Sequence, residues 1–418
     1  MKRPCNSVVL SLALLFIYGC AVSGDKLVPA GIKRGTTTDS KWPTYLHDAG
    51  RSAYSPEGVS FPATVFWSKK IMPFFSGGEG FVVSPVILNG VIYAGSAGER
   101  FYALDLKTGG VLWSFKTDSP VEAPASVDES RVYFGTSEGT FYCLDRLTGF
   151  ELWRFKARSE MHSAPTLRNG YVYLTPADNR VYALKKETGE KAWTYAHNSA
   201  KFVFSRFNNS AAAEGGSIFA LFPDGYMVSL DAVNGKELWK TAILTETLPS
   251  AEVRRIPLAS RAEAGDNRLY AIDASGMVVA FDAKTGKKLL EYGVAGAIDF
   301  ALAGETLFIA SSDKVFAVDS STGSTLWKAA ASYGKPLSLL ASGEHVFIIS
   351  NYESGIFGTN YWKSSAGYAE AFLAKDGLRA WGGKIGPVLG TPPALADDIM
   401  ALVTPEGRLM VLGSRLRE

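Results

Sequence analysis

The chain carries short runs of alternating apolar and polar residues that recur along most of its length. The clearest unit has Tyr-Ala-Leu-Asp at residues 102–105, Thr-Gly at 108–109 and a tryptophan at Trp113. Alternation with a period of two is typical of β-strands, whereas no segment sustains the 3.6-residue period of an amphipathic helix. The unit therefore predicts two antiparallel strands joined by a tight turn.

Seven copies of this unit occur in succession. In every copy the aspartate position and the tryptophan position are eight residues apart, even where one of the two residues is replaced. A constant spacing of this kind indicates a structural repeat. The paired positions are Asp105 and Trp113, Asp145 and Trp153, Lys185 and Trp193, Asp231 and Trp239, Asp282 and Leu290, Asp319 and Trp327, and Leu373 and Trp381.

The residues of the turn explain why it is tight. An aspartate carboxylate accepts hydrogen bonds from turn amides, and the glycine after it supplies a positive φ. Two further strands precede the unit, as at residues 84–87 and 91–94, which Asn89-Gly90 separates. Four strands in a repeat of about 40 residues make one blade of a β-propeller.

An eighth blade is divided between two distant parts of the chain. Residues 65–67 (Val-Phe-Trp) match residues 111–113 (Val-Leu-Trp), and residues 409–412 resemble a third strand with no fourth strand after it. We expect the N-terminal strand around Trp67 to complete the last blade, which would remove two open sheet edges. The predicted fold is all-β, an eight-bladed β-propeller of four-stranded antiparallel blades closed in this way.

The repeated tryptophans could pack between blades or serve as stacking platforms for a ligand. Their fixed place in each outer strand, together with Leu290 in the same place in one copy, favours packing between adjacent blades. We assign this role to Trp67, Trp113, Trp153, Trp193, Trp239, Trp327 and Trp381.

The first residues have the features of an export signal. Lys2 and Arg3 precede an apolar stretch at residues 8–18, which is shorter than the roughly 20 residues of a membrane-spanning helix. Gly19 and Cys20 follow and resemble the lipobox of bacterial lipoproteins, which implies that Cys20 is lipidated. An ordinary signal peptide with an incidental cysteine is the alternative.

The predicted organisation therefore has three parts. Residues 1–19 form a lipoprotein signal peptide, residues 20–41 form the lipidated cysteine with a flexible tether, and residues 42–418 form the propeller. The lipobox resemblance, with Ala21 in place of an aspartate, implies the outer membrane.

Composition and charge exclude several functions. The 42 Gly, 24 Phe, 18 Tyr and 9 Trp suit many short strands and tight turns. A formal net charge of +2 provides no basic field for nucleic acid. Once the signal is removed and Cys20 is lipidated, Cys143 alone remains, so neither an internal disulfide nor a thiolate metal cluster can form. Cys143 lies in an alternating run, and we expect it in the core.

We find no catalytic motif in the sequence. The four histidines are isolated, without a second histidine at metal-ligand spacing, and no Gly-x-Ser-x-Gly elbow occurs. The glycine-rich residues 76–80 lack the Gly-Lys-Ser/Thr ending of a phosphate loop. We therefore predict no catalytic residue, no metal and no cofactor. His162 precedes an inner strand, and we expect it as a polar residue at the mouth of the channel.

Four long connections are predicted at one mouth of the ring. They span residues 72–80, 196–209, 245–264 and 352–368, and they are rich in aromatic residues and arginine, which make good interface anchors. The alternative is that these aromatics fold inward and plug the channel. We predict that a partner binds to Phe74, Phe75, Phe202, Phe204, Arg206, Tyr361 and Trp362.

The repeat units, from Ala103-Leu104-Asp105 to Trp113 and in their copies, resemble those of the PQQ-like (quinoprotein-type) repeat propellers over residues 60–412. Within that family, the signal type, length and blade count of this chain resemble those of the BamB lipoproteins of the outer-membrane β-barrel assembly machinery. Residues 202–206 are similar to the hydrophobic-x-hydrophobic-Arg segment through which BamB proteins contact BamA, with one additional residue before Arg206. The acidic pair of a second BamB element has no counterpart at residues 255–259.

This resemblance implies a non-catalytic, protein-binding scaffold lipoprotein on the periplasmic face of the outer membrane, with a BamA-type barrel assembly protein as its partner. Two alternatives stay open. One is a propeller that binds a small ligand or senses the state of the envelope. The other is a PQQ-dependent dehydrogenase, although adjacent cysteines are absent and the repeated aspartates are spread around the ring, where they cannot converge on one Ca²⁺.

Overall fold

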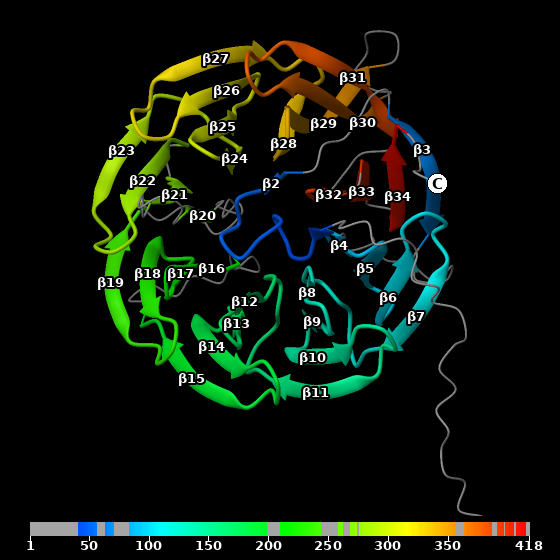
Figure 1. Cartoon of the computed structure of the whole chain (residues 1–418), viewed down its shortest axis with the longest axis vertical. Helices are drawn as coiled ribbons and strands as arrows, with labels where there is room; N and C mark the ends of the chain where they lie inside the picture. Colours follow the sequence, from blue (N-terminus) through cyan, green and yellow to red (C-terminus); the bar gives the residue numbers. More distant parts are fainter. Residues whose placement is uncertain are drawn as a thin grey trace, which may run out of the picture. The chain divides into compact units, whose positions relative to one another are not determined.

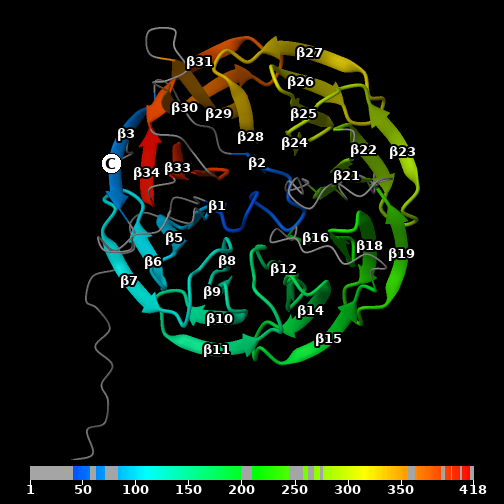
Figure 2. The ribbon, with the colours of Figure 1, turned by 180° about the vertical axis from the view of Figure 1, so that it is seen from behind.

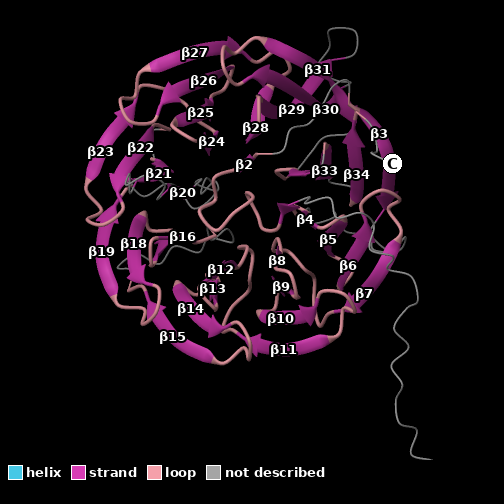
Figure 3. Cartoon of the chain, in the orientation of Figure 1, coloured by secondary structure: helices cyan, strands magenta, loops and turns pink. Residues whose placement is uncertain are grey.

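The structure, a computed structural model, describes residues 41–56, 63–70, 83–198, 210–243, 258–261, 268–273, 276–355, 363–386, 391–396, 398–404 and 407–414. These residues belong to a compact unit, Thr36–Glu418. Their regular elements are strands (Figure 3), and the strands form eight sheets arranged in a ring (Figure 1). The predicted all-β, eight-bladed propeller is confirmed. None of the described residues forms a helix that is long and apolar enough to cross a membrane.

Blades 1 to 4 follow one another along the chain, and each has its first strand nearest the axis. Blade 1 contains β4 (Val86–Leu88), β5 (Val91–Ser96), β6 (Arg100–Asp105) and β7 (Val111–Lys116). Blade 2 contains β8 (Ser126–Val127), β9 (Arg131–Gly135), β10 (Thr140–Asp145) and β11 (Glu151–Lys156). Blade 3 contains β12 (Thr166–Arg168), β13 (Tyr171–Leu174), β14 (Arg180–Lys185) and β15 (Lys191–Ala196). Blade 4 contains β16 (Ala212–Glu214), β17 (Ser217–Leu221), β18 (Tyr226–Asp231) and β19 (Glu237–Ala242).

Blades 5 to 7 continue in the same order, and blade 8 combines strands from distant parts of the chain. Blade 5 contains β20 (Leu258–Arg261), β21 (Arg268–Ile272), β22 (Val278–Asp282) and β23 (Lys288–Tyr292). Blade 6 contains β24 (Asp299–Ala303), β25 (Thr306–Ala310), β26 (Lys314–Asp319) and β27 (Thr325–Ala330). Blade 7 contains β28 (Lys335–Ser342), β29 (His345–Gly355), β30 (Lys363–Leu373) and β31 (Arg379–Gly386). Blade 8 contains β32 (Ala394–Ala396), β33 (Ile399–Val403), β34 (Arg408–Gly413) and β3 (Thr64–Lys70).

The repeat unit forms the third and fourth strands of a blade and the turn between them. In blade 1, Asp105 Oδ1 accepts hydrogen bonds from the amide and the hydroxyl of Thr108, both at 2.8 Å, and Gly109 has a φ of +68°. The Leu106 amide donates to the Gly90 carbonyl at 2.9 Å and so ties this turn to the turn between the first and second strands. The same bond joins Arg146 to Ser130, Lys186 to Gly170, Ala232 to Gly216, Ser320 to Glu305 and Ala374 to Glu344.

These bonds define two ends of the ring. The first-to-second and third-to-fourth turns lie together at one end, which we name the turn face. The second-to-third connections and the connections between blades lie at the opposite end, which we name the loop face. The distinction follows from the antiparallel order of four strands in each blade.

The repeated tryptophans contact the next blade around the ring. Trp113 Nε1 donates to the Arg146 carbonyl of blade 2 at 3.0 Å, and a Cβ atom on Gly149 in that turn would lie 2.6 Å from the Trp113 ring. The equivalent donor and acceptor pairs are Trp67 and Leu106, Trp153 and Lys186, Trp193 and Ala232, Trp239 and Ala283, and Trp327 and Ala374. Where Leu290 replaces the tryptophan, the hydroxyl of Tyr292 donates to the Ser320 carbonyl of the next blade at 2.5 Å.

Blade 8 closes the ring as predicted. β3 pairs antiparallel with β34, with Thr64 opposite Gly413, Trp67 opposite Val411 and Lys70 opposite Arg408. The two strands come from opposite parts of the sequence, so no Asp-Gly turn joins them. Trp381 in β31 therefore faces a blade without the turn that receives the other six tryptophans.

A segment outside the repeat units crosses the turn-face end of the ring. We name residues 41–56 the axial segment. Its β1 (Lys41–Trp42) pairs with β4, and its β2 (Tyr54–Ser55) pairs in parallel with β28, so it adds a fifth strand to blades 1 and 7. Figure 2 shows both strands inside the ring. Trp42, 1% exposed, joins the apolar core cluster that includes the inner strands of blades 7 and 8.

Candidate functional site

Arg51 holds the axial segment against the inner strands. Its side chain is buried and donates to the carbonyls of Ala211 (3.2 Å) and Tyr45 (2.7 Å) and to the hydroxyl of Thr166 (2.8 Å). Burial lowers the pKa of Arg51 to about 10, and the negative charge of Asp48 offsets only part of that effect. The guanidinium is therefore a structural tie between the axial segment and blades 3 and 4. Its further acceptors are Thr44, Ala164 and Pro165.

The backbone of the axial segment is strained. Four residues that are not glycine have positive φ within it, namely Leu46 (57°), His47 (76°), Arg51 (64°) and Ala53 (55°). Such conformations cost about 1–3 kcal/mol each and persist where the surroundings impose them. The hydrogen bonds of Arg51 and the backbone bonds to the inner strands impose them here. No repeat or motif marks this segment, so the sequence does not predict its place in the ring.

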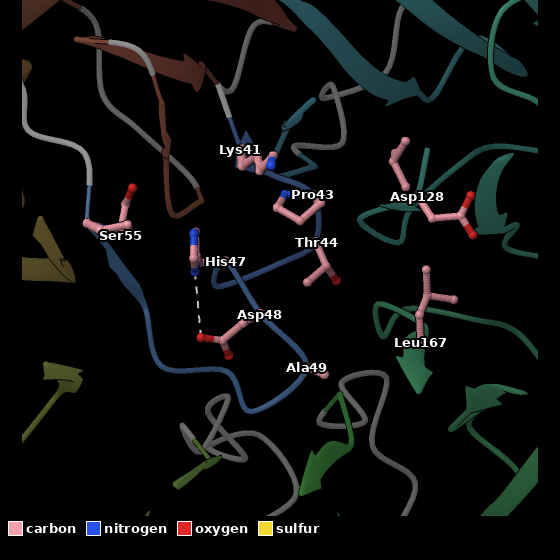
Figure 4. A pocket seen from close by; sticks show the side chains of 11 residues that line it. Lys41, Pro43, Thr44, His47, Asp48, Ala49, Ser55, Asp128 and Leu167 are labelled. Atoms are coloured by element: carbon pink, nitrogen blue, oxygen red, sulfur yellow. Dashed lines mark ion pairs between the residues drawn. The ribbon is translucent and has the colours of Figure 1, made fainter. Parts of the chain in front are cut away.

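A pocket lies between the axial segment and the inner strands of blades 2 and 3, with a volume of about 560 Å³ (Figure 4). His47 Nδ1 lies 3.6 Å from Asp48 Oδ2 in its wall. Burial opposes ionisation of Asp48, but hydrogen bonds from His47 and Ser52 outweigh it, so the pKa of Asp48 falls below its ordinary value. The lining residues are Lys41, Pro43, Thr44, His47, Asp48, Ala49, Ser55, Pro56, Val127, Asp128 and Leu167.

The residues predicted to bind a partner lie outside the described residues, as does Cys20. They are Phe74, Phe75, Phe202, Phe204, Arg206, Tyr361 and Trp362. The strands that flank their segments nevertheless end at the loop face. β15 ends at Ala196 there and β29 ends at Gly355, whereas β30 begins at Lys363.

Two of the predicted long connections contain more strand than the sequence analysis expected. Residues 352–368 were predicted as a loop, but β29 and β30 pair as far as Gly355 and Lys363. Residues 245–264 were also predicted as a loop, but β20 lies within them and pairs with β21. Both predictions are wrong in these parts, because cross-strand backbone pairing overrides a composition typical of loops.

Next to these segments, the loop face carries two well-packed clusters. His197 Nε2 lies 2.7 Å from Asp224 Oδ2, and its ring stacks on Phe222 with centroids 4.2 Å apart; the His197 side chain is 0% exposed. This pair lies at the end of β15, before the segment that contains Phe202 and Arg206. It therefore anchors the root of that segment.

The second cluster is aromatic and belongs to blade 7. The rings of Tyr333 and Tyr368 stack with centroids 4.4 Å apart, and Tyr352, which is 41% exposed, meets Tyr368 edge to face at 5.9 Å. The guanidinium of Arg379 lies 5.2 Å from the centroid of Tyr333. Exposed tyrosine next to arginine is a composition enriched at protein interfaces.

His162 lies at the loop face between two carboxylates. Its Nδ1 is 3.1 Å from Glu122 Oε2, and its Nε2 is 2.8 Å from Glu160 Oε2. The sequence predicts His162 as an isolated rim residue, whereas in the structure it has two carboxylate partners. Glu122 stands 40 residues before His162, so an alignment of the repeats would have placed the two at equivalent positions of adjacent blades.

The pattern of repeats has a match among known families. A sequence profile described as "Outer membrane protein assembly factor BamB" matches residues 62–137 and 100–329, which is well over half of the chain. The chain belongs to the BamB family. The match to the BamB profile ends before β28, and blade 7, which follows, has the two longest strands of the described ring. No curated protein matches the sequence.

Solved structures share the BamB-like fold. The crystal structure of BamB from Moraxella catarrhalis matches 84% of this chain and 100% of its own, with a TM-score of 0.65 and 16% identity. Quinohemoprotein alcohol dehydrogenase from Comamonas testosteroni matches 90% of this chain and 82% of its own, with a TM-score of 0.66 and 14% identity. The computationally designed Ika8 protein matches 81% of this chain and 98% of its own, with a TM-score of 0.64 and 16% identity. At these identities the likeness shows the fold alone.

The dehydrogenase among these structures raises the question of a quinone cofactor. Such a cofactor with Ca²⁺ needs several convergent oxygen ligands. Across the described ranges, no group of three or more His, Cys, Asp or Glu side chains is placed to hold a metal ion. The turn aspartates, such as Asp105 and Asp145, use Oδ1 for their own turn amides. The described residues therefore contain no cluster of carboxylates that would hold such a Ca²⁺ ion.

Proposed function

We propose that this BamB-family chain is a non-catalytic, protein-binding scaffold lipoprotein of the outer membrane, an accessory subunit of the machinery that assembles β-barrel proteins there. The match to the BamB family profile carries the proposal. Cys20 would carry the lipid on the periplasmic side, after removal of residues 1–19, and residues 20–41 would be the tether. The partner would be a BamA-type barrel assembly protein.

The loop face is the proposed docking surface. The segments that contain Phe74 and Phe75, Phe202 to Arg206, and Tyr361 with Trp362 all join strands that end there. The buried His197–Asp224 pair and the stacked tyrosines of blade 7 give two of these segments rigid roots. Loops on a rigid scaffold are where proteins commonly carry binding residues.

Crosslinking in whole cells tests the proposal. A photoreactive amino acid at Tyr352 on the loop face should trap an outer-membrane assembly protein, whereas the same probe at Val233 on the turn face should not. Val233 is 65% exposed and Tyr352 is 41% exposed, so poor access cannot explain silence at the control position. Crosslinks confined to Val233, or none to an assembly protein, would contradict the proposal.

Substitution of the predicted contacts gives a second test. Arg206→Ala and Trp362→Ala should abolish partner capture without a change in melting temperature, because the loss would lie in the interface. Unfolding of either variant would instead indicate that these side chains plug the channel. Labelled palmitate should enter the wild type and not Cys20→Ala.

The pocket beside His47 favours a second candidate, a propeller that binds a small ligand or senses envelope state. Its size of about 560 Å³ is within the range of small-molecule sites. Leu167→Trp would fill it. If partner capture survives that substitution and metabolite extracts no longer raise the melting temperature, the ligand-binding function is favoured. A titration with PQQ and Ca²⁺ should show no binding, and saturable binding would support a dehydrogenase.

A further inference from the structure

Glu122, His162 and Glu160 form a row of side chains at the loop face, which we name the carboxylate–imidazole row. The side chains of Glu122 and His162 are 14% and 10% exposed, and that of Glu160 is 42% exposed. Both ring nitrogens of His162 lie within hydrogen-bond distance of a carboxylate oxygen. Ionised carboxylates only accept, so an imidazole that donates to both of them carries a proton on each nitrogen and is positively charged.

The row joins two separate connections of the ring. Glu122 belongs to the connection between β7 and β8, whereas Glu160 and His162 belong to the connection between β11 and β12. Equivalent backbone bonds hold both connections, from the Val121 amide to the Ser96 carbonyl (3.1 Å) and from the Met161 amide to the Thr136 carbonyl (3.2 Å). The row is thus a side-chain bridge between neighbouring inner walls of the channel mouth.

Loss of one proton changes this bridge. A neutral imidazole donates from one nitrogen only, so one carboxylate would face a ring nitrogen that also accepts. Among the residues that the structure describes, the charged groups placed against His162 are Glu122 and Glu160. Burial by itself lowers the pKa of His162, but the hydrogen bonds and charges of the two carboxylates outweigh burial, and the pKa is raised above 6.5.

We propose that the carboxylate–imidazole row is a proton-operated clasp that holds the channel mouth of blades 2 and 3 in one shape and loosens it when His162 loses its proton. Because the folded group holds its proton more tightly than the unfolded one, the clasp contributes fully below pH 6.5. Its contribution is lost as the pH rises through the folded pKa. Partner capture at the loop face should follow the same direction, a consequence that rests on the proposed function.

The test uses the full chain without any partner. Nuclear magnetic resonance of the ring protons gives the pKa of His162, and hydrogen exchange of the Met161 and Ala177 amides, corrected for the intrinsic rate, reports the state of the connection. We expect a pKa above 6.5 and, toward alkaline pH, a loss of protection of up to about tenfold for each unit of excess. Ala177 is informative because its amide donates to the Glu160 carbonyl at 3.0 Å.

Three variants separate the clasp from other causes. In His162→Gln, the corrected protection of the Met161 and Ala177 amides should no longer vary with pH. Glu122→Gln should lower the pKa of His162. His345→Gln is the matched control, because His345 lies in β29, burial lowers its pKa, and the profile should persist without it. A His162 pKa at or below 6.5, or a persistent profile in His162→Gln, overturns the proposal. No partner enters these measurements, so their failure bears on the clasp alone, and crosslinking measures the docking function separately.

Discussion

The ring of Trp153 lies against Gly189 of the next blade so closely that a Cβ atom on the glycine would be 2.5 Å from Trp153 Cε3. The same tryptophan donates its Nε1 hydrogen to the Lys186 carbonyl at 3.1 Å, in the turn that contains the glycine. One side chain thus uses its face and its polar edge on a single turn. Because this contact recurs around the ring, the tryptophan of one blade fixes the position of the turn in the next blade.

This contact predicts different effects at two glycines that share a backbone conformation. Gly189 (φ +73°) faces Trp153, whereas a Cβ atom on Gly170 (φ +80°) would meet nothing within 4 Å. Gly170→Ala should lower the free energy of unfolding by about 1 kcal/mol through φ alone. Gly189→Ala should lower the free energy of unfolding by about 2–4 kcal/mol, because overpacking against Trp153 adds to the cost of the positive φ. Urea unfolding measures both, and equal losses would refute the packing role.

Because Arg51 makes so many buried hydrogen bonds, we predict that the packing of the axial segment depends on this one side chain. Arg51→Met should lower the free energy of unfolding by roughly 2–4 kcal/mol, because buried carbonyl acceptors lose their donor. Arg51→Lys should lose nearly as much, since an ammonium cannot replace the planar five-donor guanidinium. Arg100→Met, at an exposed position, is the control and should stay within about 0.5 kcal/mol of the wild type. A neutral Arg51→Met would contradict the structural tie.

The closing strand predicts the effect of a deletion. Removal of residues 60–70 takes away β3 and exposes the edge of β34, so the truncated chain should aggregate or lose cooperative unfolding. Removal of residues 22–32, which are equal in number and belong to the predicted tether, should leave unfolding unchanged. Circular dichroism and light scattering decide between the two outcomes. A soluble and equally stable 60–70 deletion would count against the closure.

We predict that Glu370 and Arg379 of blade 7 stabilise the protein as a coupled pair. Glu370, 1% exposed, accepts a hydrogen bond from the Ser332 amide at 2.9 Å and lies 3.0 Å from Arg379 Nη2. Arg379→Met should cost about 2–4 kcal/mol because a buried carboxylate loses its counterion. The double variant with Glu370→Met should recover most of that loss. A double-mutant cycle measures the coupling, and simple additivity would show that the pair is not coupled.

Blade number and ring closure could be predicted because each repeat carries its own signal. Asp105, Gly109 and Trp113 each perform a local task that leaves a fixed residue type at a fixed spacing. The closing strand kept that signature at Trp67, although its partner strand lies at the other end of the sequence. Features that the repeat imposes can therefore be predicted from each copy by itself.

Other features could not be predicted because tertiary contacts alone create them. Arg51 has no neighbour in sequence that reveals its acceptors in blades 3 and 4. Glu122 and His162 differ in chemistry although they share a place in the repeat. The strands β29 and β30 extend through Ser-Gly-rich sequence, where pairing between backbones decides the structure.

The position of β3 also sets an order of events in time. On the ribosome its residues are made long before β34, with which they pair. At roughly 5–20 residues per second, the interval lasts some tens of seconds. During that interval β3 has no partner strand, although blade 1, with which β1 pairs, already has all of its own strands. Ring closure therefore waits for β34, and until that strand is available a chaperone would have to shield the unpaired edge of β3.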